Sequence, residues 1–286
     1  IHLDREVNKN RTINAQDHLP ALIGAAQPAA ENDFLQLLAE ELPAQWQRDN
    51  DTSAPKHGID TILDHELLLY DTQRAVVQGL RGEYIAAARL DNLLSCYIDA
   101  QALLGACADE KDQAQWSLLI CSDHEEVGSQ SAAGAGGPFL AQVLQRIEPD
   151  PQLLARALSR SMLISTDNAH ASHPNYADKM DSNHAPIINA GPVIKVNANQ
   201  RYASNSETQA VFRALCAAND IPLQNFVMRS DMACGSTIGP ITATELGIKT
   251  LDVGVPTLAM HSIRELAGSR DTGLMRAALQ AFYARR

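Results

Sequence analysis

The segment "WSLLICSDHEEVGSQ" (116–130) decides the fold class. It begins with a short apolar run and continues directly into Asp123, His124, Glu125 and Glu126. A short apolar run bounded by polar residues predicts a strand that is buried on both faces. Four titratable groups at the end of such a strand are typical either of a solvated turn or of the edge of an active site.

The segments around this stretch alternate between helical and strand patterns. Helical spacing is found in residues 32–42, 92–107, 139–147, 152–162 and 206–220, and the last of these opens with a Ser206-x-x-Gln209 capping box. Strand patterns are found in residues 59–80, 116–123, 163–167, 191–198 and 249–256, and residues 262–268 are expected to start the last helix. Short buried strands separated by helices predict an α/β fold, in which a mostly parallel mixed sheet is sandwiched by helices.

Composition excludes several classes of function. The 286 residues, 45% of them hydrophobic, suffice for one large domain or two smaller ones with real cores. The net charge of −11 without a basic stripe argues against a nucleic-acid partner. No apolar run approaches the roughly 20 residues that cross a bilayer, so no membrane partner is expected. Five cysteines without a C-x-x-C pair indicate reduced thiols, and hence a cytoplasmic protein.

Charged residues stand at four predicted strand exits. Asp91 precedes a helix, Glu125 and Glu126 follow residues 116–122, Asp167 ends the run 163–167, and His261 follows the strand pattern at 249–256. Side chains at strand exits gather at one edge of an α/β sheet. Carboxylates with one imidazole suit zinc, manganese or cobalt, and one carboxylate can bridge two ions roughly 3.5–4 Å apart. In the adjacent glutamate pair, one carboxylate can bind the metal while the other acts as general base.

Each residue also has an ordinary structural interpretation. Asp91 alone fits a helix N-cap, and the glutamate pair fits a solvated turn or the first turn of a helix. Asp167 lies in a sequence typical of turns, and a single histidine such as His261 is usually a packed, hydrogen-bonded residue. The set is therefore more informative than any of its members.

Longer motifs link the set to a known family. The chain resembles the aspartyl aminopeptidase family, which are cocatalytic zinc exopeptidases, from residue 1 to about 270, most loosely at about 15–65. The resemblance rests on "IHLDREVN" (1–8), "LDN" (90–92), "DHEEVGSQSAAGAGGPF" (123–139), "STDNAHASHPNY" (165–176), "GPVIKVNANQRYASNSET" (191–208) and "RSDMACGSTIGPITATELGIKTLDVGVPTLAMHSIRE" (229–265). It implies a zinc-exopeptidase-like fold and removal of an N-terminal residue, commonly Asp or Glu, from peptides.

The resemblance also assigns roles at the metal site. It implies that Asp91 bridges two metals, that Glu126 and His261 complete the first site, and that Asp167 binds the second metal. Glu125 would be the general base. Two zinc ions are expected per subunit, with cobalt or manganese as possible substitutes.

Four further residues are implied to contact the substrate. The family places His170, Lys195 and Tyr202 against it, and His2 resembles a histidine that reaches a neighbouring subunit's active site. Since the whole protein repels a carboxylate, selectivity for Asp or Glu needs a local cation, which Lys195 supplies. Without the resemblance, Lys195 would be interpreted as a solvated lysine and Tyr202 as a half-buried packing residue.

The sequence departs from the family in one metal ligand. The family has a histidine in an H-T-D-like motif on an N-terminal strand, whereas His18, His57 and His65 lie in other contexts, which leaves the second metal only Asp91 and Asp167. We therefore expect a segment to precede Ile1. Residues 1–82 are expected to be the remainder of an inserted β-rich assembly domain and residues 83–286 the catalytic domain, within a homo-oligomer of commonly twelve subunits.

Two other functions remain open from the sequence. A related dinuclear deacylase or carboxypeptidase shares the same set of ligands but releases an acyl group or a C-terminal residue. A catalytically silent oligomeric scaffold needs no metal at all.

Overall fold

The computed structural model describes residues 2, 7–9, 11–24, 34–50, 62–108 and 115–285, without the side chains of residues 43–50. The chain divides into two compact units, Ile1–Leu69 and Tyr70–Arg286. The residues discussed as a site, His2 excepted, all belong to the second unit.

The first unit contains two helices in its described part. These are α1 (Ala15–His18) and α2 (Phe34–Asn50), and α2 confirms the helical spacing predicted for 32–42 from residue 34 onward, residues 32 and 33 lying outside the described residues. His18 and His65 are exposed, and His57 lies outside the described residues. The strand-like pattern of residues 59–80 is wrong for residues 62–75, which have no regular structure. Of the β-rich character expected for residues 1–82, the described residues show only β1 (Val76–Gln78), which lies in the second unit.

The second unit contains two mixed sheets. The five-stranded sheet has the order β1-β2-β9-β8-β4 and adds β2 (Tyr84–Ala87), β9 (Glu265–Gly268), β8 (Pro256–Leu258) and β4 (Ala169–His170) to β1. Its pairs are antiparallel except β4 with β8. The four-stranded sheet has the order β3-β7-β5-β6 and consists of β3 (Met162–Thr166), β7 (Lys249–Gly254), β5 (Val193–Val196) and β6 (Gln224–Val227). Here β3 pairs with β7 and β5 with β6 in parallel, and β5 pairs with β7 antiparallel.

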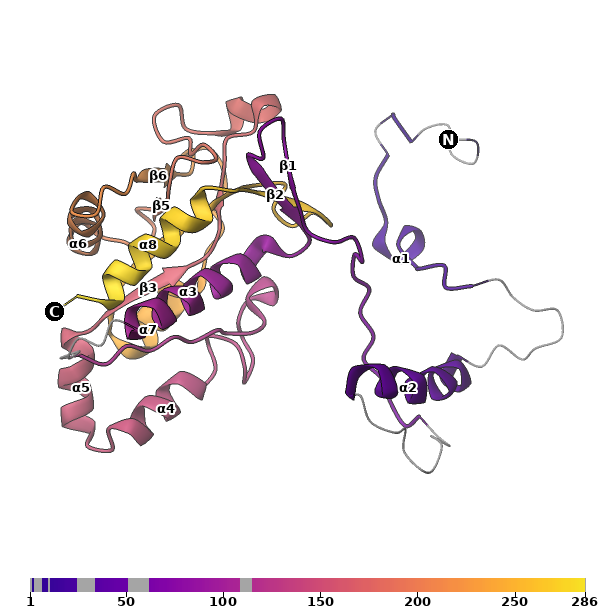
Figure 1. Cartoon of the computed structure of the whole chain (residues 1–286), viewed down its shortest axis with the longest axis horizontal. Helices are drawn as coiled ribbons and strands as arrows, with labels where there is room; N and C mark the ends of the chain where they lie inside the picture. Colours follow the sequence, from indigo (N-terminus) through magenta and orange to yellow (C-terminus); the bar gives the residue numbers. More distant parts are fainter. Residues whose placement is uncertain are drawn as a thin grey trace. The chain divides into compact units, whose positions relative to one another are not determined.

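Helices cover the four-stranded sheet on both faces. On one face lie α3 (Leu90–Ala108), α6 (Ser206–Ala217) and α8 (Asp271–Tyr283), and α3 and α8 run side by side (Figure 1). Their buried side chains share one core with Ile194, Leu251 and Val253. On the opposite face, Gly239 of α7 (Ile238–Leu246) approaches the Asp252 carboxylate. The predicted α/β sandwich is confirmed.

Along the two central strands β5 and β7, apolar residues that pack in the core alternate with polar residues on the other face of the sheet. Ile194 and Leu251 point into the core, so their neighbours Lys195 and Asp252 point to the other face because successive strand residues alternate. Both polar residues are nonetheless almost fully buried. The sheet therefore carries a polar, water-poor layer beside the candidate site.

Helix α4 (Phe139–Ile147) confirms its predicted range, and α5 (Pro151–Arg160) confirms the pattern predicted for 152–162 except at its end, because Met162 begins β3. The strand predicted at 116–123 is wrong, because residues 116–122 pair with no strand among the described residues, and only Asp123 forms an isolated bridge, to Gly134. The edge strand β3 and residues 118–122 instead line the same cavity, of about 160 Å³.

Two helix starts also differ from prediction. The capping box of α6 is formed by Asn205 and Thr208 and not by Ser206 and Gln209. Residues 265–268 form β9 instead of a helix, and α8 starts at Asp271. None of the described helices is long and apolar enough to span a bilayer.

Candidate metal and substrate site

Three predicted residues from distant segments bring their side chains together. Nε2 of His261 lies 3.3 Å from Oδ2 of Asp91 and 3.1 Å from Oε2 of Glu126. One potential ligand atom of each residue lies within 4.8 Å of those of the other two. We call Asp91, Glu126 and His261 the 91–126–261 triad. An imidazole and two carboxylates at this spacing can hold one divalent transition-metal ion.

Local backbone geometry presents each member of the triad. Asp91 lies at the start of α3 with a non-helical backbone (φ −83°, ψ 110°), directly after the strand β2 and its turn. It is not a conventional N-cap. His261 lies in the turn between β8 and β9 with a left-handed φ of 64°.

Glu126 follows Glu125 in a short 3-10 helix (Glu125–Val127). This turn ends at Gly128, whose φ of 96° favours glycine, and the Gly128 N–H donates to the Glu125 carbonyl at 2.9 Å. The first turn is tied to the following loop, because Nδ1 of His124 lies 2.7 Å from the Ser131 hydroxyl. The acidic cluster is therefore held by its own short-range contacts.

Asp91 is a buried carboxylate whose surroundings favour a cation. Its side chain is only 5% exposed, and Oδ1 is a buried atom without a hydrogen-bond partner among the described residues. Burial, followed by the carboxylates of Asp167 and Glu126, raises the pKa of Asp91 to about 8. Since an unpartnered buried acceptor costs free energy, a divalent cation fits this position by supplying the missing partner and offsetting the negative charge.

Glu125 stands beside the triad and not within it. The side chain is half-buried and lines the cavity of about 160 Å³ together with Asn92 and Asp167. Burial, and then the carboxylates of Asp167 and Glu126, raises the pKa of Glu125 to about 6, whereas Lys195 and His261 act in the opposite direction. A carboxylate with this pKa is suited to exchanging a proton near neutral pH.

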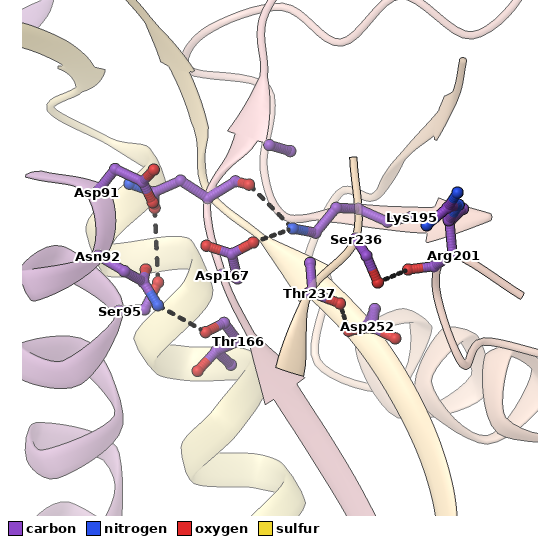
Figure 2. A network of polar contacts seen from close by, with 12 residues as sticks. Asp91, Asn92, Ser95, Thr166, Asp167, Lys195, Arg201, Ser236, Thr237 and Asp252 are labelled. Atoms are coloured by element: carbon purple, nitrogen blue, oxygen red, sulfur yellow. Dashed lines mark hydrogen bonds and ion pairs between the residues drawn. The ribbon is translucent and has the colours of Figure 1, made fainter. Parts of the chain in front are cut away.

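Asp167 lies between the triad and a buried lysine. After burial, its carboxylate is the largest cause of the raised pKa of Asp91, so the two carboxyl groups lie close together. On the other side, Oδ2 of Asp167 accepts from Nζ of Lys195 at 2.8 Å, and Nζ also donates to the Asn168 carbonyl at 2.9 Å (Figure 2). The Lys195 side chain is 3% exposed, so the interpretation as a solvated lysine is wrong. Asp167 thus connects the two halves of the site.

Two more predicted residues surround Lys195. Nζ of Lys195 lies 5.3 Å from the ring centroid of Tyr202, which is 5% exposed and therefore more buried than its packing interpretation implied. Burial raises the pKa of Tyr202, followed by a hydrogen bond with Cys234. Partial burial, and then the Lys195 ammonium, lowers the pKa of His170. The rings of His170 and Tyr202 both pack against Phe226.

The fourth predicted substrate residue, His2, belongs to the other unit. It is exposed and lies in the unit Ile1–Leu69. Its contact with a neighbouring subunit stays a prediction.

Several polar residues that hold the site together were not predicted. Nδ2 of Asn92 donates to the Thr166 carbonyl at 2.9 Å (Figure 2). Nδ2 of Asn168 donates to the Leu90 carbonyl at 3.0 Å, so two amides join the start of α3 to the end of β3. Asp252 accepts from the Thr237 hydroxyl at 2.7 Å and from the Ala203 N–H at 2.6 Å. Asn92 and Asn168 adjoin Asp91 and Asp167 in the sequence, which is the one signal that could have identified them.

Comparison with known proteins identifies a family that matches nearly the whole chain. A family model described as aminopeptidase I zinc metalloprotease (M18) matches residues 1–283. A relative in Stutzerimonas stutzeri (strain A1501), described as a probable M18 family aminopeptidase 2, is 55% identical over 285 residues, which cover 99% of this chain and 63% of the relative. The chain therefore spans less than two thirds of this relative's length.

Solved structures resemble the chain as well. A cryo-EM structure of the Ape4 and Nbr1 complex contains a chain that is 34% identical with a TM-score of 0.87, over 99% of this chain and 56% of that one. The S. cerevisiae mApe1 dodecamer is 29% identical with a TM-score of 0.69, over 75% of this chain and 49% of that one.

Proposed function

The chain belongs to the M18 family of zinc aminopeptidases, and from this premise we propose that it hydrolyses the N-terminal residue, Asp or Glu, from peptides. The observation that carries the proposal is the 91–126–261 triad, in which one buried oxygen of Asp91 has no partner among the described residues.

Asp91, Glu126 and His261 would hold the first zinc ion. The Asp167 carboxylate raises the pKa of Asp91, and this proximity of two carboxyl groups supports a second ion held by these two residues; cobalt or manganese would be chemically acceptable in either place. A bound zinc supplies Lewis-acid polarisation of the scissile carbonyl and lowers the pKa of water.

Glu125 acts as general base in this proposal. Its carboxylate accepts a proton from the attacking water and returns it to the leaving amine, which is the role that a carboxylate with a pKa of about 6 can perform in both directions near neutral pH. The Glu126 carboxylate contacts His261 and would bind the metal, whereas Glu125 would act as the base.

The preference for an acidic N-terminal residue rests on Lys195. The chain carries a net charge of −11, so an acidic side chain is attracted only where a local cation is present. Lys195 is a desolvated cation beside Tyr202 and Asp167, and charge-assisted hydrogen bonds are strengthened in such surroundings. His170 would line the same pocket, and His2 would approach it from a neighbouring subunit.

We also propose a homo-oligomer, of twelve subunits by similarity to the mApe1 dodecamer, with residues 1–82 in the assembly domain and residues 83–286 in the catalytic domain. The five cysteines are free in the structure, which supports a reducing compartment such as the cytoplasm.

The test compares one acidic peptide with a free N-terminus and its N-acetylated form. Zinc-loaded protein should release the N-terminal Asp from the free-amine peptide only. Cleavage of the acetylated peptide, or release of a C-terminal residue, would instead identify a deacylase or carboxypeptidase. A protein that binds no metal and cleaves neither peptide would be a scaffold.

A further inference from the structure

Glu265 joins two members of the triad through their main chains. Its Oε2 atom accepts from the Asp91 N–H at 2.7 Å, and its Oε1 atom accepts from the His261 N–H at 2.7 Å. The residue is the first of β9 and is 2% exposed. One carboxylate therefore fixes two backbone positions that are far apart in the sequence.

The two main chains need such a restraint. His261 has a left-handed φ of 64°, a conformation that costs a non-glycine residue about 1–2 kcal/mol. Asp91 departs from helical geometry within α3. A hydrogen bond to each N–H holds both residues in these conformations, and in them Nε2 of His261 reaches to 3.3 Å from Oδ2 of Asp91.

The chemistry of Glu265 also argues for more than packing. Burying a carboxylate is costly unless it is paired, and among the described residues no basic side chain forms an ion pair with Glu265. The two main-chain donors are thus what stabilises its charge. Residues that orient metal ligands from outside the ligand shell commonly change metal affinity by about 10- to 100-fold.

We propose that Glu265 is a positioning residue, which holds the backbones of Asp91 and His261 so that their side chains form a preorganised divalent-metal site. The inference rests on the proposed metal site. Glu265 touches neither the metal nor the substrate and acts only through the two residues it holds.

The test substitutes Glu265→Gln in the full chain and measures zinc affinity by competition with a chromogenic chelator. A carboxamide of the same size offers one acceptor and one NH₂ donor, so one of the two main-chain N–H groups faces another donor. We expect zinc affinity to fall about 10- to 100-fold, with no peptide substrate present.

Asp271→Asn is the matched control. Asp271 is likewise fully buried, and its two oxygens accept from the Asn189 N–H at 2.5 Å and the Gly191 N–H at 2.8 Å. The same chemical change is thus made at the start of α8, where it affects the 189–191 turn. The free energy of unfolding of Asp271→Asn should fall by an amount comparable to that of Glu265→Gln, whereas its zinc affinity should stay at the wild-type value.

The outcomes separate the inference from the proposed function. Equal zinc affinity in wild type and Glu265→Gln would overturn the positioning role while leaving the metal site intact. Equal losses of zinc affinity in Glu265→Gln and Asp271→Asn would also overturn it, because the loss would then be a general effect of lowered stability. A wild-type chain that binds no zinc would overturn both proposals. If Glu265→Gln does not fold, Glu265→Asp replaces it: a shorter carboxylate cannot reach both N–H groups, so wild-type zinc affinity in that variant would also overturn the inference.

Discussion

Nζ of Lys195 lies 2.8 Å from Oδ2 of Asp167, so the proposed specificity cation and the proposed second-metal ligand are paired with each other. Both side chains are largely buried, at 3% and 18% exposed. A substitution at one residue therefore removes the ion-pair partner of the other, and substrate selectivity is coupled to the electrostatics of the metal site.

Lys195→Met tests the selectivity proposal. Removing a charge-assisted hydrogen bond costs about 1.5–3 kcal/mol, so kcat/KM for an Asp peptide should fall roughly 10- to 100-fold more than for the matching Leu peptide. Lys249→Met is the control, because Lys249 forms its ion pair with Glu207 at the exposed surface. Equal losses on Asp and Leu peptides would remove Lys195 from the specificity pocket.

Glu125→Gln tests the general base. The amide cannot accept the proton from the attacking water, and we expect kcat to fall by about 10²–10⁴-fold while the zinc content is unchanged. Steady-state kinetics and metal analysis of the same sample provide the check, with the exposed Glu245→Gln as control. Wild-type turnover by zinc-loaded Glu125→Gln would contradict this assignment.

Gly254→Ala tests the close approach of β7 to Asp167. A Cβ atom at position 254 would overlap the Asp167 carbonyl oxygen, so one backbone must move. We expect a loss of at least about 2 kcal/mol in the free energy of unfolding, together with reduced activity. A methyl group added at Gly273 in α8 would meet no heavy atom of the described residues within 4 Å, so Gly273→Ala should be neutral or stabilising by up to about 1 kcal/mol. Urea denaturation should therefore show a loss of stability for Gly254→Ala and none for Gly273→Ala, and equal effects would contradict the account.

Asp99 predicts a pH dependence of stability. Burial raises the pKa of Asp99 to about 6, against an ordinary value of about 3.9. The folded chain thus binds this proton more tightly than the unfolded chain. The stability that the protonated Asp99 contributes is therefore fully present below about pH 4 and is lost as the pH rises to about 6. Asp99→Asn removes the titration and keeps an acceptor for the Thr166 hydroxyl.

The expected result is a stability difference that depends on pH. Relative to wild type, the free energy of unfolding of the Asp99→Asn variant should rise by about 2–3 kcal/mol between pH 4 and pH 7, as measured by urea denaturation. Glu245→Gln should show no such change. A pH-independent difference between Asp99→Asn and wild type would show that Asp99 titrates near its ordinary pKa.

Sequence patterns located α2, α3, α4, α5 and α6 because their apolar spacing is local, whereas α1 and α7 were not predicted. The strand expected at 116–123 failed because a strand is defined by its partner, and the composition of "WSLLICSD" carries no information on whether β3 lies within hydrogen-bonding reach. The start of α8 was misplaced for a related reason, since residues 265–268 pair with β2 and β8 across long sequence separations.

The members of the site were predicted from residue type and motif, and the meeting of Asp91, Glu126 and His261 in the structure follows those predictions. The residues that hold them were not predictable in the same way. Glu265 and Asp252 are ordinary acidic residues in the sequence, and only the folded chain brings Glu265 to the N–H groups of Asp91 and His261. Positioning roles depend on distances between backbones, which residue spacing does not encode.

Anomalous diffraction from crystals of the zinc-loaded protein, recorded above and below the zinc absorption edge, tests the central claim most directly. The account predicts a zinc peak bonded to the side chains of Asp91, Glu126 and His261. A fully loaded, active protein with its zinc bound elsewhere and none at these three side chains would contradict it.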